Sequence, residues 1–263
     1  APYNAGGESL PSPVLAVRRP ASERSSVLIV NGYDAFSRFE NPIQTIPAGP
    51  MERPIPRRVN SFDYVVHRHQ ALAAHNLSFD SCPNVVAESG DVILASYDAV
   101  VWILGRESTL TETLSATEQA LLNDYLLGGG RLFITGSDLA WDLDAQGGGQ
   151  FFYNTTLGSG FVADDANTYA VTGADGIFAD LASFDFDPAN GAPNDTRSPD
   201  EITAQTGAIN ALSYVGGTGG TAGVQYDGGG YRIVTFGFPF EAITSPLVRT
   251  DVMGRVMGFL LTD

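Results

Sequence analysis

Continuous apolar runs alternate with segments of helical periodicity along most of the chain. The runs at 26–32, 98–105, 131–136 and 231–238 are apolar at consecutive positions and are bounded by polar residues or glycine. Strands that are apolar on both faces are typical of a parallel sheet covered on each side. Residues 60–75 and 115–130 instead repeat apolar side chains every three or four positions, as amphipathic helices do. The alternation predicts an α/β fold.

The ends of the predicted helices carry local signals. Asn60 or Ser61 is placed to cap the first helix, and Ser115 with Glu118 forms a capping box at the start of the second. Gly128 to Gly130 would end that helix. Residues 240–261 repeat valine and leucine every four positions and predict a closing helix.

Two regions depart from this alternation. Residues 33–58 contain five prolines and predict a long loop, which in a compact domain is usually functional or mobile. Beyond residue 150 the pattern loosens into short strands separated by glycine-rich turns.

Composition and charge exclude several function classes. The 263 residues carry a net charge of −16, and all 14 basic residues are arginine, so lysine chemistry is absent. An acidic surface repels phosphate backbones, which argues against nucleic acid as a partner. One cysteine, Cys82, excludes an internal disulfide, and three histidines make a histidine-rich metal site improbable. No apolar stretch is long enough to span a membrane. The composition suits an exported bacterial protein.

The first 24 residues differ from the rest. "NAGGESLPSPVLAVRRP" resembles the last strand of a fibronectin type III module. The resemblance implies that 1–24 are the tail of a preceding fibronectin type III-like module with its linker, and that 25–263 form the main α/β domain. Other domains of the same parent chain are then expected partners.

Several motifs fall in order along the main domain. They include "VLIVNGYD", "YDAVVWILGRES", "LSATEQALLNDYLLGGGRLFITGSDLAWDLD" and "FGFPFEAI". Together they resemble the golvesin-like or xanthan-lyase-like module of secreted bacterial proteins. That module is similar in design to the class I glutamine amidotransferase-like fold. The resemblance implies a flavodoxin-like three-layer sandwich with a mostly parallel central sheet, whose active region lies at the carboxyl ends of the strands.

The bend after the run at 131–136 is a candidate nucleophile site. The sequence Gly136-Ser137-Asp138 follows an apolar strand, and hydrolases often present a nucleophilic hydroxyl at such a bend. The family resemblance also implies a nucleophile here, with Ser137 in place of cysteine. Where that family has its histidine, this chain has Phe238. The Cys-His-Glu triad is therefore absent, and the alternative is that Ser137 only caps a helix.

Carboxyl groups at the ends of the predicted strands form a second candidate site. Asp34, Glu107, Asp138 and Glu241 each follow a strand, and Asp142 lies one helical turn beyond Asp138. Converging carboxylates perform general acid–base catalysis or bind calcium. The alternative is that each acid caps a helix or is solvated. No cofactor and no metal ligand set is predicted, with calcium kept as a possibility.

Aromatic and basic residues border the same edge. Tyr33 and Trp141 would stack on a sugar ring, and Arg38 and Arg106 would bind an anionic group such as a uronate carboxylate. The alternatives are core packing for the aromatic rings and simple surface exposure for the arginines.

Two functions follow from these patterns. The first is an amidotransferase-like module, outside the cell or at its surface, that binds or processes polysaccharide or cell-wall material without the usual triad. The alternative is an extracellular hydrolase of esters or glycans that depends on Ser137 or on the carboxylates. Both expect a carbohydrate or cell-wall ligand, no nucleic acid and no membrane span.

Overall fold

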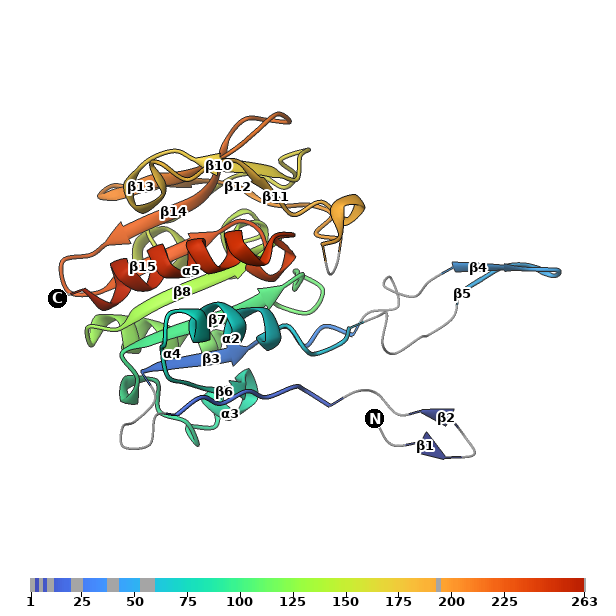
Figure 1. The fold of residues 1–263 in the computed structure, drawn as a ribbon, viewed down its shortest axis with the longest axis horizontal. Helices are drawn as coiled ribbons and strands as arrows, with labels where there is room; N and C mark the ends of the chain where they lie inside the picture. Colours follow the sequence, from blue (N-terminus) through green and yellow to red (C-terminus); the bar gives the residue numbers. More distant parts are fainter. Residues whose placement is uncertain are drawn as a thin grey trace.

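One large mixed sheet with helices packed on it dominates the protein (Figure 1). The computed structural model describes residues 3–4, 7–8, 12–19, 26–36, 43–52, 60–192 and 195–262. The sheet has 11 strands, and its main path runs β11-β10-β13-β14-β15-β8-β7-β3-β6. Strand β12 pairs with β14 and β9 beside this path.

The first half of the sheet is parallel. Its strands are β3 (Val27–Asn31), β6 (Phe79–Pro83), β7 (Ala99–Gly105), β8 (Arg131–Gly136) and β15 (Arg232–Phe236). Each pairs in parallel with its neighbours in the order β6-β3-β7-β8-β15. Every residue of β3 and β7 is buried, as their continuous apolar runs predict.

Helices cover both faces of this parallel half. In the part of the chain that the structure describes, the α-helices are α2 (Val65–Ala74), α3 (Asn84–Glu88), α4 (Ala116–Leu127) and α5 (Pro246–Leu261). Val27 and Ile29 share a core with α2 and α5, whereas Leu28 and Val30 share the other core with α3 and α4. Because alternate strand residues point to opposite faces, these two cores lie on opposite sides of the sheet.

The second half of the sheet is antiparallel. Its strands are β9 (Ser159–Ala163), β10 (Ala170–Gly173), β11 (Phe184–Asp185), β12 (Glu201–Ala204), β13 (Ala208–Tyr214) and β14 (Thr221–Asp227). The links β12–β13, β13–β14 and β14–β15 are short turns, and a parallel crossover needs a dozen or more residues. The expectation of a flavodoxin-like sandwich with a mostly parallel sheet is therefore wrong.

Short helical turns complete the architecture. Among the described residues, the 3₁₀ turns are η2 (Leu94–Ser96), η5 (Gly176–Phe178), η6 (Pro188–Asn190) and η7 (Phe240–Ala242). The π-helical turns there are η3 (Trp141–Ala145) and η4 (Phe152–Thr156). Within the described residues, no helix combines the length and apolar character that a membrane span requires.

Helix boundaries confirm some sequence signals and correct others. The capping box of Ser115 and Glu118 is present, and α4 ends before Gly128 as predicted. Helix α2 begins at Val65 rather than near residue 60, because Asn60 accepts a hydrogen bond from the Phe62 amide and Phe62 is left-handed (φ 53°). Helix α5 begins at Pro246 because Ser245 caps it.

The regions outside the main alternation also contain structure. Part of the proline-rich loop is a hairpin, β4 (Ile43–Ile46) with β5 (Gly49–Glu52). Near the N-terminus, β1 (Tyr3–Asn4) pairs with β2 (Gly7–Glu8). Residues 12–19, the N-terminal arm, lie along the edge of β6, where Arg18 and Phe79 exchange two backbone hydrogen bonds of 2.8 Å each. The predicted domain boundary at 24–25 lies outside the described residues.

Candidate functional site

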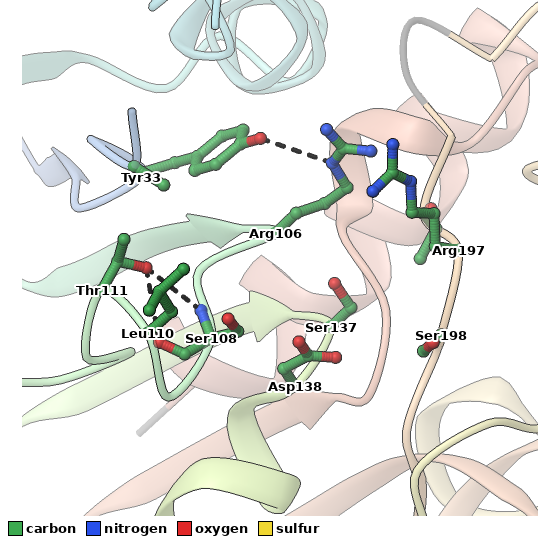
Figure 2. Close-up of a pocket in the computed structure, with 11 residues that line it drawn as sticks. Tyr33, Arg106, Ser108, Leu110, Thr111, Ser137, Asp138, Arg197 and Ser198 are labelled. Atoms are coloured by element: carbon green, nitrogen blue, oxygen red, sulfur yellow. Dashed lines mark hydrogen bonds between the residues drawn. The ribbon is translucent and has the colours of Figure 1, made fainter. Parts of the chain in front are cut away.

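A cavity of about 210 Å³ lies at the carboxyl ends of β3, β7 and β8 (Figure 2). From β3 the chain passes to β6 on one side and then to β7 on the other. Such a switch point in strand order leaves a crevice where open α/β sheets bind ligands. The cavity is lined by Tyr33, Ala35, Arg106, Ser108, Leu110, Thr111, Ser137, Asp138, Thr196, Arg197 and Ser198.

At the bend after β8, the residue with the unusual backbone conformation is not the predicted nucleophile, Ser137, but the next residue, Asp138. Ser137 is 2% exposed, and its amide and its hydroxyl both donate to the Gly105 carbonyl, at 2.9 and 3.3 Å. The residue in the left-handed backbone conformation is Asp138 (φ 58°). Aspartate adopts this conformation more readily than most residues other than glycine, and at this bend the Asp138 side chain lines the cavity. The geometry therefore singles out Asp138 at the bend.

The Asp138 side chain is half-buried and lines the cavity. Burial and the nearby carboxyls of Asp164 and Asp142 raise the pKa of Asp138 to about 7, although the positive charge of Arg106 opposes the rise. Desolvation and like charges both disfavour the ionised form, so this carboxyl takes up a proton near neutral pH.

Two guanidinium groups face the same cavity. Arg106 Nη1 donates to the Asp195 carbonyl at 2.7 Å, and its Nε donates to the Tyr33 hydroxyl at 3.4 Å. The Tyr33 ring packs on Tyr64 with centroids 4.8 Å apart. Figure 2 shows Arg197 beside Arg106, on the side of the cavity across from Asp138. The cavity thus presents fixed positive charge and several hydroxyls close to one carboxyl.

Asp138 also belongs to a group of three acids that the sequence did not reveal. One carboxylate oxygen each from Asp138, Asp164 and Asp200 lies within 4.8 Å of the others. Glu201 of β12 pairs with Ala163 of β9 in antiparallel register, so Asp200 and Asp164 come together beside that pair. In the sequence, these acids appear only as Asp164-Asp165 after β9 and Pro199-Asp200 before β12. Neither pair indicates a site until the pairing of the two strands is known.

The three acids differ in exposure. Asp164 is exposed, Asp138 is half-buried, and Asp200 is completely buried. Asp200 Oδ2 accepts hydrogen bonds from the amides of Ala140 and Trp141, at 2.7 and 3.3 Å. Burial and the charge of Asp138 nevertheless raise the pKa of Asp200 well above its ordinary value.

Glu107 and Asp34 lie near the cavity but are not among its lining residues. Glu107 is 1% exposed, and its Oε1 accepts hydrogen bonds from the amides of Asp34, at 2.7 Å, and of Ala35. Burial raises the pKa of Glu107 to about 8. Asp34 is exposed and accepts a 3.5 Å hydrogen bond from the Asn84 amide group. Glu107 therefore fixes the loop after β3, which carries Tyr33.

The other predicted site residues are not brought to the cavity. Glu241 is completely buried and forms a 2.6 Å ion pair with Arg68. Asp142 accepts two 2.8 Å hydrogen bonds from Thr113, and the Trp141 ring packs on Phe161 with centroids 5.6 Å apart.

Two positions from the sequence analysis remain, Arg38 and Phe238. Arg38 lies outside the described residues. Phe238, which stands where a catalytic histidine was sought, is completely buried and stacks on Phe186 at 4.7 Å.

Comparison with known proteins identifies similar folds but no family. No protein-family model matches the chain, and no curated protein matches it. Solved structures do match, and three are a β-galactosidase from Rahnella sp. R3, an exo-β-1,4-mannosidase from Opitutaceae bacterium strain TAV5 and a cytoplasmic protein from Salmonella typhimurium. Their TM-scores are 0.53, 0.52 and 0.55, with 16%, 12% and 12% sequence identity.

The extent of these matches limits what they imply. Each match covers about nine-tenths of this chain, but only 31% of the β-galactosidase and 35% of the mannosidase, against 98% of the Salmonella protein. At such identities the fold alone is shared. The structural neighbours include glycoside hydrolases, and the predicted resemblance to golvesin-like and amidotransferase-like modules is wrong, because neither the sheet nor the matched structures agree with it.

Proposed function

We propose that this chain is a glycan-active hydrolase domain that binds an acidic sugar in the cavity and uses Asp138 at the scissile bond. The observation that carries the proposal is the position of Asp138, which has a left-handed backbone at the bend after a central parallel strand and lines the cavity. Burial and neighbouring carboxyls raise the pKa of Asp138 to about 7, and a carboxyl with a raised pKa in a cleft is a candidate for acid–base catalysis.

The lining favours a sugar over an apolar ligand. Ser108, Thr111 and Ser198 supply hydroxyl groups, and sugars are recognised by many hydrogen bonds. Arg106 and Arg197 add planar cationic groups that pair with carboxylates, as a uronic acid would require. The glycosidases among the structural neighbours support the same substrate class, at the level of fold. The proposal includes an extracellular location, which the acidic, lysine-free composition suggests.

A screen of wild type and Asp138→Asn on nitrophenyl glycosides and acidic oligosaccharides tests the hydrolase directly. Proton transfer by a positioned side chain contributes roughly 10²–10⁴-fold in rate, so we expect kcat/KM to fall by at least about 100-fold. Asp124→Asn, which removes an exposed carboxyl from α4, is the matched control and should leave kcat/KM unchanged. Loss of activity in Ser137→Ala but not in Asp138→Asn would instead identify Ser137 as the nucleophile.

A second candidate is a glycan-binding module without catalysis. Within the described lining, Asp138 is the one carboxyl, whereas most glycosidases use a pair. In that case acidic oligosaccharides would bind, Arg106→Gln would weaken binding, and no substrate would be turned over. Calorimetry alongside the activity screen separates the two candidates.

A further inference from the structure

We propose that Asp138, Asp164 and Asp200 form a binding site for Ca²⁺ at the wall of the cavity. Three carboxylate oxygens from three separate chain segments lie within 4.8 Å of one another. Carboxylate oxygen is the donor that hard cations prefer, and this group contains no nitrogen or sulfur ligand that would favour a transition metal.

The buried Asp200 is the observation that points to a cation. Its side chain is completely buried, and Oδ1 has no hydrogen-bond partner among the described residues, although Oδ2 accepts two backbone amides. An unpaired carboxylate oxygen costs substantial free energy when it is removed from water. The amides on Oδ2 hold the carboxylate in place, and a cation shared with Asp138 and Asp164 would satisfy the remaining oxygen.

The chemistry of the ligands favours calcium over magnesium. Ca²⁺ accepts about six to eight oxygen ligands in a flexible geometry, which suits a group of carboxylates whose oxygens lie within 4.8 Å of one another. Mg²⁺ demands near-ideal octahedral geometry and usually keeps several waters, so a group made only of protein carboxylates suits it less well. The gradation from buried Asp200 to exposed Asp164 also leaves one side of the site open, and Ca²⁺ takes further ligands from water or substrate there.

The position of the site suggests what the ion does, and this part rests on the proposed function. Asp138 is shared between the acid group and the cavity, so the open coordination positions lie beside the sugar-binding space. A bound cation would there coordinate the carboxylate of an acidic sugar and help to hold it beside Asp138.

Calorimetric titration of the chelator-treated full chain with CaCl₂ tests the site without any substrate. We expect one Ca²⁺ per chain with a Kd of about 0.1–1 mM, the range of extracellular calcium modules, and a raised Tm. Asp164→Asn and Asp200→Asn should each weaken binding about tenfold or more, whereas Asp124→Asn should bind as wild type does. Asp164 is exposed, so Asp164→Asn should fold. Its Ca²⁺ affinity therefore decides the question even if Asp200→Asn fails to fold.

Two results would overturn the site: no heat and no change in Tm at 10-fold the expected Kd, or unchanged binding in Asp164→Asn. Its failure is distinguishable from failure of the hydrolase. Ca²⁺ binding without turnover of any glycan leaves the site intact and refutes the hydrolase. Turnover that persists in a chelator, in a chain that binds no Ca²⁺, refutes the calcium site and leaves the hydrolase intact.

Discussion

At the scale of single residues, Glu107 shows how a buried acid can shape a cavity without lining it. Its carboxyl is almost completely buried and accepts the amides of Asp34 and Ala35. These bonds hold the loop that carries Tyr33 against the end of β7. Burial raises the pKa of Glu107 from 4.5 to about 8, so the folded protein keeps a proton there that the unfolded chain loses above pH 5.

This pKa predicts a pH-dependent stability. Because the folded pKa lies above the unfolded value, the free energy of unfolding should fall as pH rises from about 5 to 8. Glu107→Gln keeps the accepting oxygen and removes the titration, so its stability relative to wild type should increase over that range, by on the order of 3 kcal/mol. Urea denaturation at several pH values measures the difference. A constant difference between the two proteins from pH 5 to 8 would contradict the assignment.

The bend after β8 shows what residue-level sequence analysis could achieve. The apolar run, Gly136 and Ser137 predicted a bend, and the structure places that bend at the cavity, which Tyr33 and Arg106 also line. The sequence did not show which of Ser137 and Asp138 has the left-handed backbone, since both are compatible with a bend. Asp164 and Asp200 were missed because a strand pairing, rather than a motif, brings them to Asp138.

At the scale of elements, a buried ion pair connects α2 to the segment after β15. Arg68 and Glu241 have fully buried side chains, and Arg68 also donates to the Thr135 hydroxyl on β8. Nothing in the sequence indicated that Arg68 is buried, because arginine on a helix is usually exposed.

Breaking this pair should destabilise the protein strongly. Arg68→Met leaves the Glu241 carboxylate buried without its cation, which costs roughly 3–5 kcal/mol in comparable pairs. The double variant Arg68→Met/Glu241→Gln removes both charges and should recover part of that loss. Urea unfolding of both single variants and the double variant gives the coupling energy. A loss below about 1 kcal/mol in Arg68→Met would show that the pair is dispensable.

Sequence patterns predicted where individual helices and strands lie better than they predicted which strands pair. The buried strands and α4 were located closely because long apolar runs and caps are local signals. Strands β9, β10, β13 and β14 were also expected as short strands. Their antiparallel pairing was not expected, because apolar alternation identifies a strand without giving its direction or neighbour.

At the scale of the molecule, both halves of the mixed sheet contribute residues to the candidate site. The parallel half has its crevice at the carboxyl ends, where β3, β7 and β8 deliver Tyr33, Arg106 and Asp138. The antiparallel half contributes Asp164 and Asp200 through β9 and β12. The candidate site therefore lies where the two halves of the sheet meet, and neither half contains all of its residues.

The N-terminal arm has a consequence for how molecules meet one another in solution. Strand β6 ends the parallel half of the sheet, and an uncovered edge strand is a template on which another chain can add a strand. The arm uses that edge through the backbone of Arg18 and Phe79 and through Ser81, whose hydroxyl bonds to the backbone of Ala16.

Deletion of residues 1–19 should therefore reduce stability by about 2 kcal/mol and make the protein self-associate as its concentration rises, as light scattering would detect. Arg19→Ala removes the exposed ion pair with Asp80 but keeps the backbone contacts, and it should stay monodisperse. A shortened chain that scatters like the intact one at every concentration would show that the edge needs no cover. If the shortened chain associates, the arm prevents polymerisation at the edge of β6 as well as contributing to the stability of the fold.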